Sequence, residues 1–248
     1  MSQYLLAPHV HLCVTDDHAV LLDLKRDKYI GVGRAQMRAL HQRVKGWPAV
    51  PPASGETASL PAASSADTLL SRMLASGMLT TDAARGKEAV PASMPRPQAT
   101  LAEVDPASSG DLFDTRPALS ARHVLNFLLA CTMARLSLRF RSIASVVARA
   151  AARKARHGRT RLGVDMEAAR RHVAAYVYLR PLLFTAKDAC LFDALALTNY
   201  LARFGIFATW VFGVQTGPFA AHSWVQHDDV VLNDTPDNVR RYAPILTV

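Results

Sequence analysis

A proline-rich stretch near the middle of the chain does most to limit what the chain can fold into. Between residues 83 and 117 it carries five prolines among alanine, serine and acidic residues, and its apolar residues follow neither helical nor strand spacing. We therefore expect two modules, at residues 1–84 and 119–248, joined by a linker at 85–118. Half of the 248 residues are apolar, which is enough for two cores, and no apolar run is long enough to span a membrane.

The first module begins with short runs in which apolar and polar residues alternate, a pattern typical of strands. The runs cover residues 10–14, 19–24 and 28–32, and polar turn residues separate them. Helical spacing of apolar residues follows at 37–44 and again at 69–74. The pattern predicts a small three-stranded antiparallel sheet followed by helices.

Cys190 stands directly before an apolar segment of the second module that we expect to be helical. Residues 191–204 are nearly uncharged, and Gly205 follows them, as is common just past the end of a helix. Cys190 would then lie at a helix N-terminus, where the helix dipole and unpaired backbone N–H groups favour the thiolate. A cysteine beside an apolar helix is more often an inert core residue, so its role depends on what lies near it.

His222 and Asp234 belong to two strand-like runs, at 221–226 and 230–234, on either side of residues 227–229. If those three residues form the turn of a hairpin, the pairing is centred on position 228 and places His222 directly opposite Asp234. Opposed side chains share a face, with Cβ atoms roughly 5 Å apart, so the carboxylate would hold the imidazole. A cysteine nucleophile, a base and an orienting carboxylate predict acyl-transfer chemistry.

Four segments of the second module resemble the leader peptidases of lasso-peptide biosynthesis, which are called B proteins. The segments are Cys190-Leu-Phe-Asp-Ala-Leu-Ala-Leu, Trp210-Val-Phe-Gly-Val, Pro218-Phe-Ala-Ala-His222-Ser-Trp-Val and Leu232-Asn-Asp234. That family is similar to transglutaminase-like and papain-like folds. The resemblance implies a cysteine peptidase that separates leader from core in a ribosomally made precursor, with Cys190, His222 and Asp234 as its catalytic residues. It also implies a separate asparagine-synthetase-like partner that closes a lactam on the freed amine.

The first module is similar to the leader-recognition domain, a winged-helix-like fold known from pyrroloquinoline quinone biosynthesis and fused to many B proteins. The similarity implies that a leader peptide adds a strand to the sheet edge and lays apolar side chains against a helix. The leader-binding residues would be Lys28, Tyr29, Ile30, Val32, Leu69 and Met73. Alternatively, the peptidase domain covers this edge, or the helix only packs on the sheet.

The fold class expected for the whole chain is therefore α+β. It combines an N-terminal winged-helix-like, three-stranded leader-recognition domain with a C-terminal transglutaminase-like (papain-like) cysteine peptidase domain. Two other functions stay open for this architecture. One is a transglutaminase-like acyltransferase, in which an amine outcompetes water, and the other is a non-catalytic leader-binding chaperone or scaffold.

A basic segment precedes Cys190, and the sequence does not determine what it meets. Residues 135–161 hold nine Lys or Arg residues and no acidic residue, a charge equal to the +9 of the whole chain. A solvated basic face is the default interpretation. The alternatives are a weak contact with an anionic membrane surface, the partner synthetase, or an acidic segment of the precursor. Nucleic acid is not expected, because no aromatic residue lies among the arginines after Phe140.

No cofactor and no metal are expected. The Gly31-Val-Gly33 segment lacks the third glycine and the lysine of nucleotide-binding loops. His9, His11 and Cys13 alternate along one strand, but an exposed strand face explains them without a metal. The three cysteines of the chain form no C-x-x-C motif and cannot all pair, which favours a reducing cytoplasm.

Overall fold

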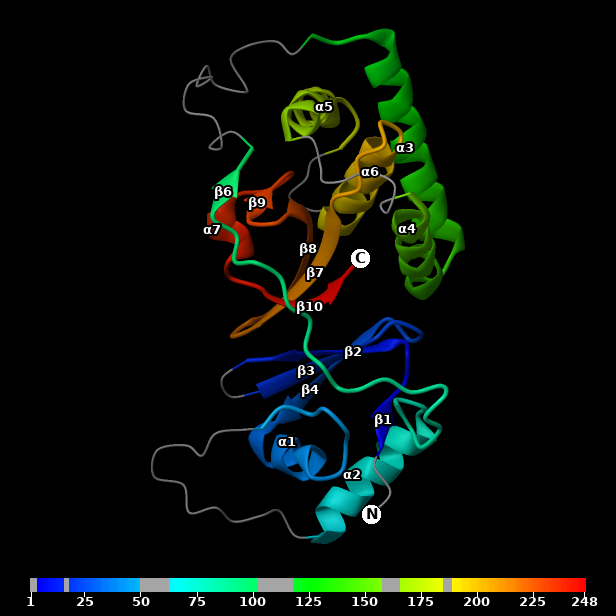
Figure 1. The fold of residues 1–248 in the computed structure, drawn as a ribbon, viewed down its shortest axis with the longest axis vertical. Helices are drawn as coiled ribbons and strands as arrows, with labels where there is room; N and C mark the ends of the chain where they lie inside the picture. Colours follow the sequence, from blue (N-terminus) through cyan, green and yellow to red (C-terminus); the bar gives the residue numbers. More distant parts are fainter. Residues whose placement is uncertain (1–3, 16–17, 50–62, 102–117, 158–165, 185–188) are drawn as a thin grey trace. The chain divides into compact units, whose positions relative to one another are not determined.

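The computed structural model forms two compact units, which we describe separately (Figure 1). One unit comprises residues 1–93 with 243–246, and the other comprises 94–242 with 247–248. The described residues are 4–15, 18–49, 63–101, 118–157, 166–184 and 189–248.

The first unit is built on an antiparallel sheet of three strands in the order β2-β3-β4. The strands are β2 (Val10–Val14), β3 (His18–Asp23) and β4 (Lys28–Gly33). The register places Leu12 opposite Leu21 and Leu21 opposite Ile30, so these apolar residues of the three strands share one face. The predicted strands are present, and β4 forms one edge of the sheet.

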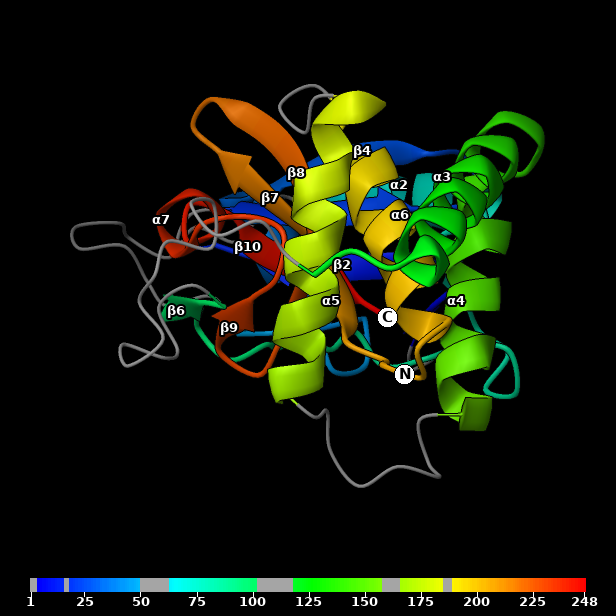
Figure 2. The same cartoon turned by 90° about the horizontal axis from the view of Figure 1, so that it is seen from above.

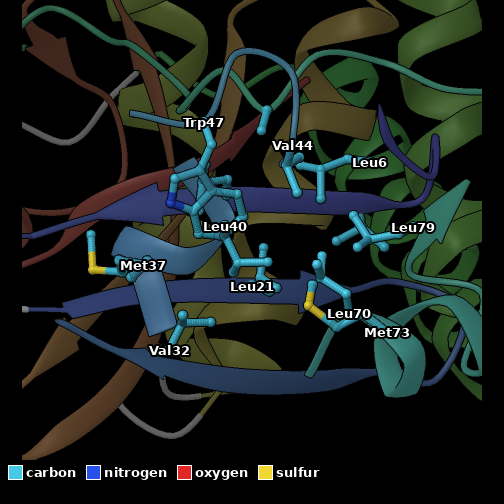
Figure 3. Packing of buried hydrophobic residues seen from close by; sticks show 14 of the residues in the cluster. Leu6, Leu21, Val32, Met37, Leu40, Val44, Trp47, Leu70, Met73 and Leu79 are labelled. Carbon is cyan, nitrogen blue, oxygen red and sulfur yellow. The ribbon is translucent and has the colours of Figure 1, made fainter. Parts of the chain in front are cut away.

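Two helices cover that apolar face and complete the core of the first unit (Figure 3). The helices are α1 (Arg34–His41) and α2 (Ala63–Ala75). The unit also contains two short strands, β1 (Leu5–Leu6) and β5 (Leu79–Thr80). Figure 3 shows Met37 and Leu40 of α1, and Leu70 and Met73 of α2, in one cluster with Leu21 of β3. The helical spacing in the sequence therefore marks the side of each helix that faces the sheet.

A five-stranded sheet in the order β10-β7-β8-β9-β6 forms in the C-terminal part of the chain. The strands are β6 (Ala99–Thr100), β7 (Thr209–Thr216), β8 (Phe219–His227), β9 (Val230–Val231) and β10 (Ala243–Thr247). The longest pairing is antiparallel, between β7 and β8. β6 lies within the segment that we expected to be a linker, and it pairs in parallel with β9. Residues 102–117 of that segment lie outside the described residues.

The described helices of the second unit include α6, which carries Cys190 (Figures 1 and 2). They are α3 (Ala121–Phe140), α4 (Ile143–His157), α5 (Met166–Leu179), the 3-10 turn η3 (Arg180–Leu182), α6 (Cys190–Ala202) and α7 (Pro236–Val239). α6 packs against α3, α5 and β8, which explains why its sequence is apolar on nearly every side. Gly205 follows it with a φ of 76°, as predicted for the end of this helix. Among the helices described, none is both long and apolar enough to cross a bilayer.

Candidate active site

Cys190 is the first residue of α6, which confirms the predicted position at a helix start. The His222 side chain and the main-chain N–H groups of Ser223 and Leu191 donate hydrogen bonds to its sulfur. Together they lower the pKa of the thiol, although burial acts in the opposite direction. The helix start therefore holds a thiol that ionises more readily than an ordinary cysteine.

His222 lies in the middle of β8, opposite Gly213 of β7. Its ring lies 5.9 Å from that of Trp224 and 5.0 Å from that of Tyr242, measured between centroids. A Cβ at position 213 would lie 2.7 Å from the Trp224 ring and 2.9 Å from Cβ of Tyr242. Glycine at this position therefore leaves the space that the aromatic side chains beside the imidazole occupy.

Asp234 reaches His222 by a different route from the predicted hairpin. The turn after β8 has two residues instead of three, so Gln226 pairs with Val231, and β9 ends there. The predicted register is wrong because Asp228 adopts a left-handed conformation, with a φ of 49°, in a turn of only residues 228 and 229, so that His227 pairs with Val230. The expected contact is nevertheless present, because Asp234 lies beyond the strand with its Oδ2 atom 2.6 Å from Nε2 of His222.

The segment that starts α7 holds the Asp234 carboxylate in place. The main-chain N–H of Thr235 donates to Oδ1 at 2.7 Å, and the side-chain amide of Asn238 donates to Oδ2 at 2.9 Å. Burial alone would raise the pKa of this carboxyl, but the hydrogen bonds from His222, Thr235 and Asn238 lower it. Asp234 is thus an ionised acceptor for the imidazole.

The contacts among the three groups shift both ionisations toward the charged forms, a thiolate and an imidazolium. Burial alone would lower the pKa of His222, but its hydrogen bonds to Asp234 and Cys190 outweigh burial and raise it to about 9. Burial raises the pKa of the other two thiols, to about 11 for Cys13 and about 12 for Cys131. Of the three thiols, only that of Cys190 has a lowered pKa, which is the direction that favours nucleophilic chemistry.

A cavity of about 580 Å³ lies beside these side chains. Cys190, His222 and Asp234 all line it, so a substrate held there can meet the thiol. Its apolar wall, from segments around β6, α5 and β9, consists of Leu101, Val173, Ala174, Val177, Val231 and Leu232. Cavities of roughly 300–1,000 Å³ with mostly apolar walls and a few polar groups are typical of ligand sites.

A buried polar cluster next to the triad was missed in the sequence analysis. Asp193 lies one turn after Cys190 on α6 and is 1% exposed. Its carboxylate accepts hydrogen bonds from Tyr176 at 2.9 Å, Arg180 at 3.2 Å and Asn233 at 2.8 Å. Burial raises its pKa despite these donors. The available sequence signal was an acidic residue inside an otherwise apolar helix, but its partners are distant in sequence.

Three of the expected leader-binding residues lie on an edge strand. Lys28, Tyr29 and Ile30 lie on the edge strand β4, where Lys28 is exposed and the other two are partly buried. Ile30 packs against the core cluster of the first unit. The structure thus places these residues at a sheet edge, as the proposed mode of binding requires.

The rest of the expected leader-binding surface is closed. Val32 and Met73 are each 3% exposed and belong to the core of the first unit, and Leu69 packs against it (Figure 3). The side chains of Val32 and Met73 are therefore not open to a peptide, contrary to our expectation. Val32 lies on the face of β4 that α1 and α2 cover, and Met73 lies on the side of α2 that packs against this face.

No group of three or more His, Cys, Asp or Glu residues is placed to hold a metal ion in the described part of the chain. Residues 127–247 match the family model of the transglutaminase-like superfamily. The match includes Cys190, His222 and Asp234, so the C-terminal part of the chain carries a transglutaminase-like domain. Comparison with curated proteins and with solved structures found no match.

Proposed function

We propose that this protein is a cysteine peptidase that removes the leader from a ribosomally made lasso-peptide precursor. The observation that carries the proposal is the hydrogen-bonded series from the Cys190 thiol through the His222 imidazole to the Asp234 carboxylate. The transglutaminase-like domain supports it, because that domain is compatible with a cysteine peptidase. The resemblance of the segments around these residues to B proteins suggests the class of substrate.

The chemistry proceeds in two stages. The Cys190 thiolate attacks the carbonyl carbon of the scissile bond, and the His222 imidazolium protonates the amine as the C–N bond breaks. A thioester to the leader and a free amine on the core result. The neutral imidazole then takes a proton from water, and the hydroxide attacks the thioester carbon, which releases the leader acid and the thiolate. Asp234 orients the ring and stabilises its cationic form.

We place leader recognition in the first unit, at the edge strand β4. An extended leader would add a strand there through its main chain, next to Lys28, Tyr29 and Ile30. The position of β4 at the end of the sheet order supports this mode. In this scheme the first unit is a winged-helix-like leader-recognition domain, and the precursor and an asparagine-synthetase-like enzyme are its cytoplasmic partners.

The test uses the full chain and a precursor encoded by a short gene beside it. Mass spectrometry should detect leader and core, with one water added across the cleaved bond. Cys190→Ala should abolish cleavage and leave the affinity for a labelled leader near that of the unaltered protein. Cleavage by Cys190→Ala would refute the mechanism.

A transglutaminase-like acyltransferase is the second candidate, because the same domain family is compatible with it. In that case an added amine would be found joined to the acyl fragment, in place of the hydrolysed leader. A non-catalytic chaperone would bind the precursor and release no product. The product masses therefore separate all three functions in one experiment.

A further inference from the structure

α3 is apolar on two opposite faces. One face packs on α5 and α6, and it buries Phe127, Ala130 and Ala134. The opposite face exposes a row of large apolar side chains, which we call the α3 stripe: Leu125, Leu128, Leu129, Met133, Leu136 and Phe140. Residues three and four apart are neighbours on a helix, so the stripe is continuous over about 22 Å. An exposed apolar surface of this length marks a site of interaction.

The charges around the α3 stripe have one sign. Arg122, Arg135 and Arg139 of α3 are exposed, as are Arg141 just beyond it and Arg149 of α4. No Asp or Glu occurs between residues 118 and 157. A border that is cationic throughout complements a surface that is negative throughout, and a layer of anionic lipid headgroups is such a surface.

We propose that α3 docks this protein on an anionic lipid bilayer. The helix would lie in the plane of the membrane, with Leu125, Leu136 and Phe140 at the level of the upper acyl chains. The arginines would extend along the apolar surface and place their guanidinium groups among the phosphates. The second unit then binds lipid through the face of α3 that is opposite to the face packed on α6.

Flotation of the full chain with lipid vesicles tests this docking. The protein should float with phosphatidylcholine–phosphatidylglycerol vesicles and much less with pure phosphatidylcholine, and added salt should weaken the binding. Leu125→Glu and Leu136→Glu should each weaken it about tenfold, because each removes an apolar contact and adds a negative charge. Val90→Glu changes the net charge equally at an exposed apolar residue of the first unit, and it should leave binding unchanged.

Three results would overturn the docking proposal. One is failure of the unaltered protein to float with the anionic vesicles. Another is an equal loss of binding in Val90→Glu, which would show that overall charge is sufficient. The third is that Leu125→Glu dissociates a dimer in size-exclusion chromatography without changing flotation, because the α3 stripe would then join two copies of the chain.

A second inference rests on the buried polar cluster. The Asn233 side chain donates to Asp193 of α6 at 2.8 Å and accepts from the main-chain N–H of Val225 of β8 at 2.8 Å. It is thus tied to the helix that carries Cys190 and to the strand that carries His222, and Asp234 is the next residue. We infer that Asp193 is a positioning residue that acts through Asn233 to hold the Asp234 carboxylate against the imidazole.

This inference rests on the proposed thiolate–imidazolium pair but needs no peptide substrate for its test. The readout is the rate at which iodoacetamide alkylates Cys190, measured against pH. Asn233→Ala should lower the pKa of His222 and so raise that of the Cys190 thiol. The acidic inflection of the alkylation profile should then move upward by about one pH unit, or the reaction should slow about tenfold at pH 6. Asp193→Ala should change the alkylation profile in the same way. Asp193→Asn keeps an oxygen acceptor for Asn233, so its profile should stay close to that of the unaltered protein.

Tyr176→Phe is the matched control, because it removes a different hydrogen bond to the same carboxylate. It should lower thermal stability and leave the alkylation profile in place. A folded Asn233→Ala protein with an unchanged profile would overturn the inference, and so would an equal shift in Tyr176→Phe. Failure of precursor cleavage, by contrast, would count against the peptidase proposal and leave this result standing.

Discussion

Replacing Asp234 by asparagine should lower the pKa of His222 by about one to two units. The substitution keeps the shape of the side chain and removes the charge that faces Nε2 across 2.6 Å. A hydrogen bond to a charged group contributes about 1.5–3 kcal/mol, and about 1.4 kcal/mol corresponds to one pKa unit. Since the pKa of His222 in the intact site is about 9, His222 of the variant should titrate at about 7 to 8.

The raised pKa of His222 makes the stability of the fold depend on pH. Because the pKa of His222 is raised above its ordinary value of 6.5, the imidazolium stabilises the fold fully below pH 6.5. That contribution is lost as the pH rises through about 9. In Asp234→Asn the loss should be complete about one to two pH units earlier, and the pKa of the Cys190 thiol should rise because the pKa of its cationic partner is lower.

Two measurements check this prediction. Nuclear magnetic resonance titration of the His222 ring gives its pKa without any substrate, and the alkaline limb of the hydrolysis profile should move with it. Asp237→Asn is the control, because Asp237 is an exposed carboxylate three residues further along that pairs with Arg240. An unmoved titration in Asp234→Asn, or an equal shift in Asp237→Asn, would refute the reasoning.

Three further predictions follow from burial and packing. Iodoacetamide at pH 7 should label Cys190 and spare the other two cysteines, as peptide mass mapping would show, because burial raises the pKa of both other thiols. Gly213→Ala should lower the free energy of unfolding, measured by urea denaturation, by about 1–3 kcal/mol, because its Cβ would lie 2.7 Å from the Trp224 ring. Gly31→Ala is the control and should not show this loss, because the space around its Cβ is open. Met73→Ala should destabilise the core of the first unit by about 2–5 kcal/mol, and a change below about 1 kcal/mol would contradict its burial.

Local patterns predicted the elements well. The alternation in residues 10–32 gave the strands of the first unit, and the apolar run closed by Gly205 gave the helix that begins at Cys190. Their signals lie within a few neighbouring residues, so a single sequence is sufficient. The contact between His222 and Asp234 was also expected, but from a register that the two-residue turn displaces by one position. Nothing in the sequence shows which residue of that turn adopts a positive φ.

Features that depend on distant parts of the chain were not predicted. Asp193 meets Asn233 from 40 positions away, and one sequence contains no sign of that pairing. Val32 and Met73 have the residue types of a binding surface as well as those of a core, and only the packing of α1 and α2 on the sheet decides between the two. The α3 stripe was hidden because apolar residues on both faces of a helix erase the periodicity that reveals its buried side.

The segment around β6 determines where a shorter fragment of this chain can begin. The family match begins at residue 127, but Thr100 and Leu101 line the cavity, and β6 covers the edge of β9. Gln226 donates to the carbonyl of Pro95 at 2.9 Å, so the sheet holds this segment by more than strand pairing. A fragment trimmed to the family boundary would lose one wall of the cavity and expose an unpaired strand, which favours aggregation. A fragment of the transglutaminase-like domain for expression should therefore begin before Pro95.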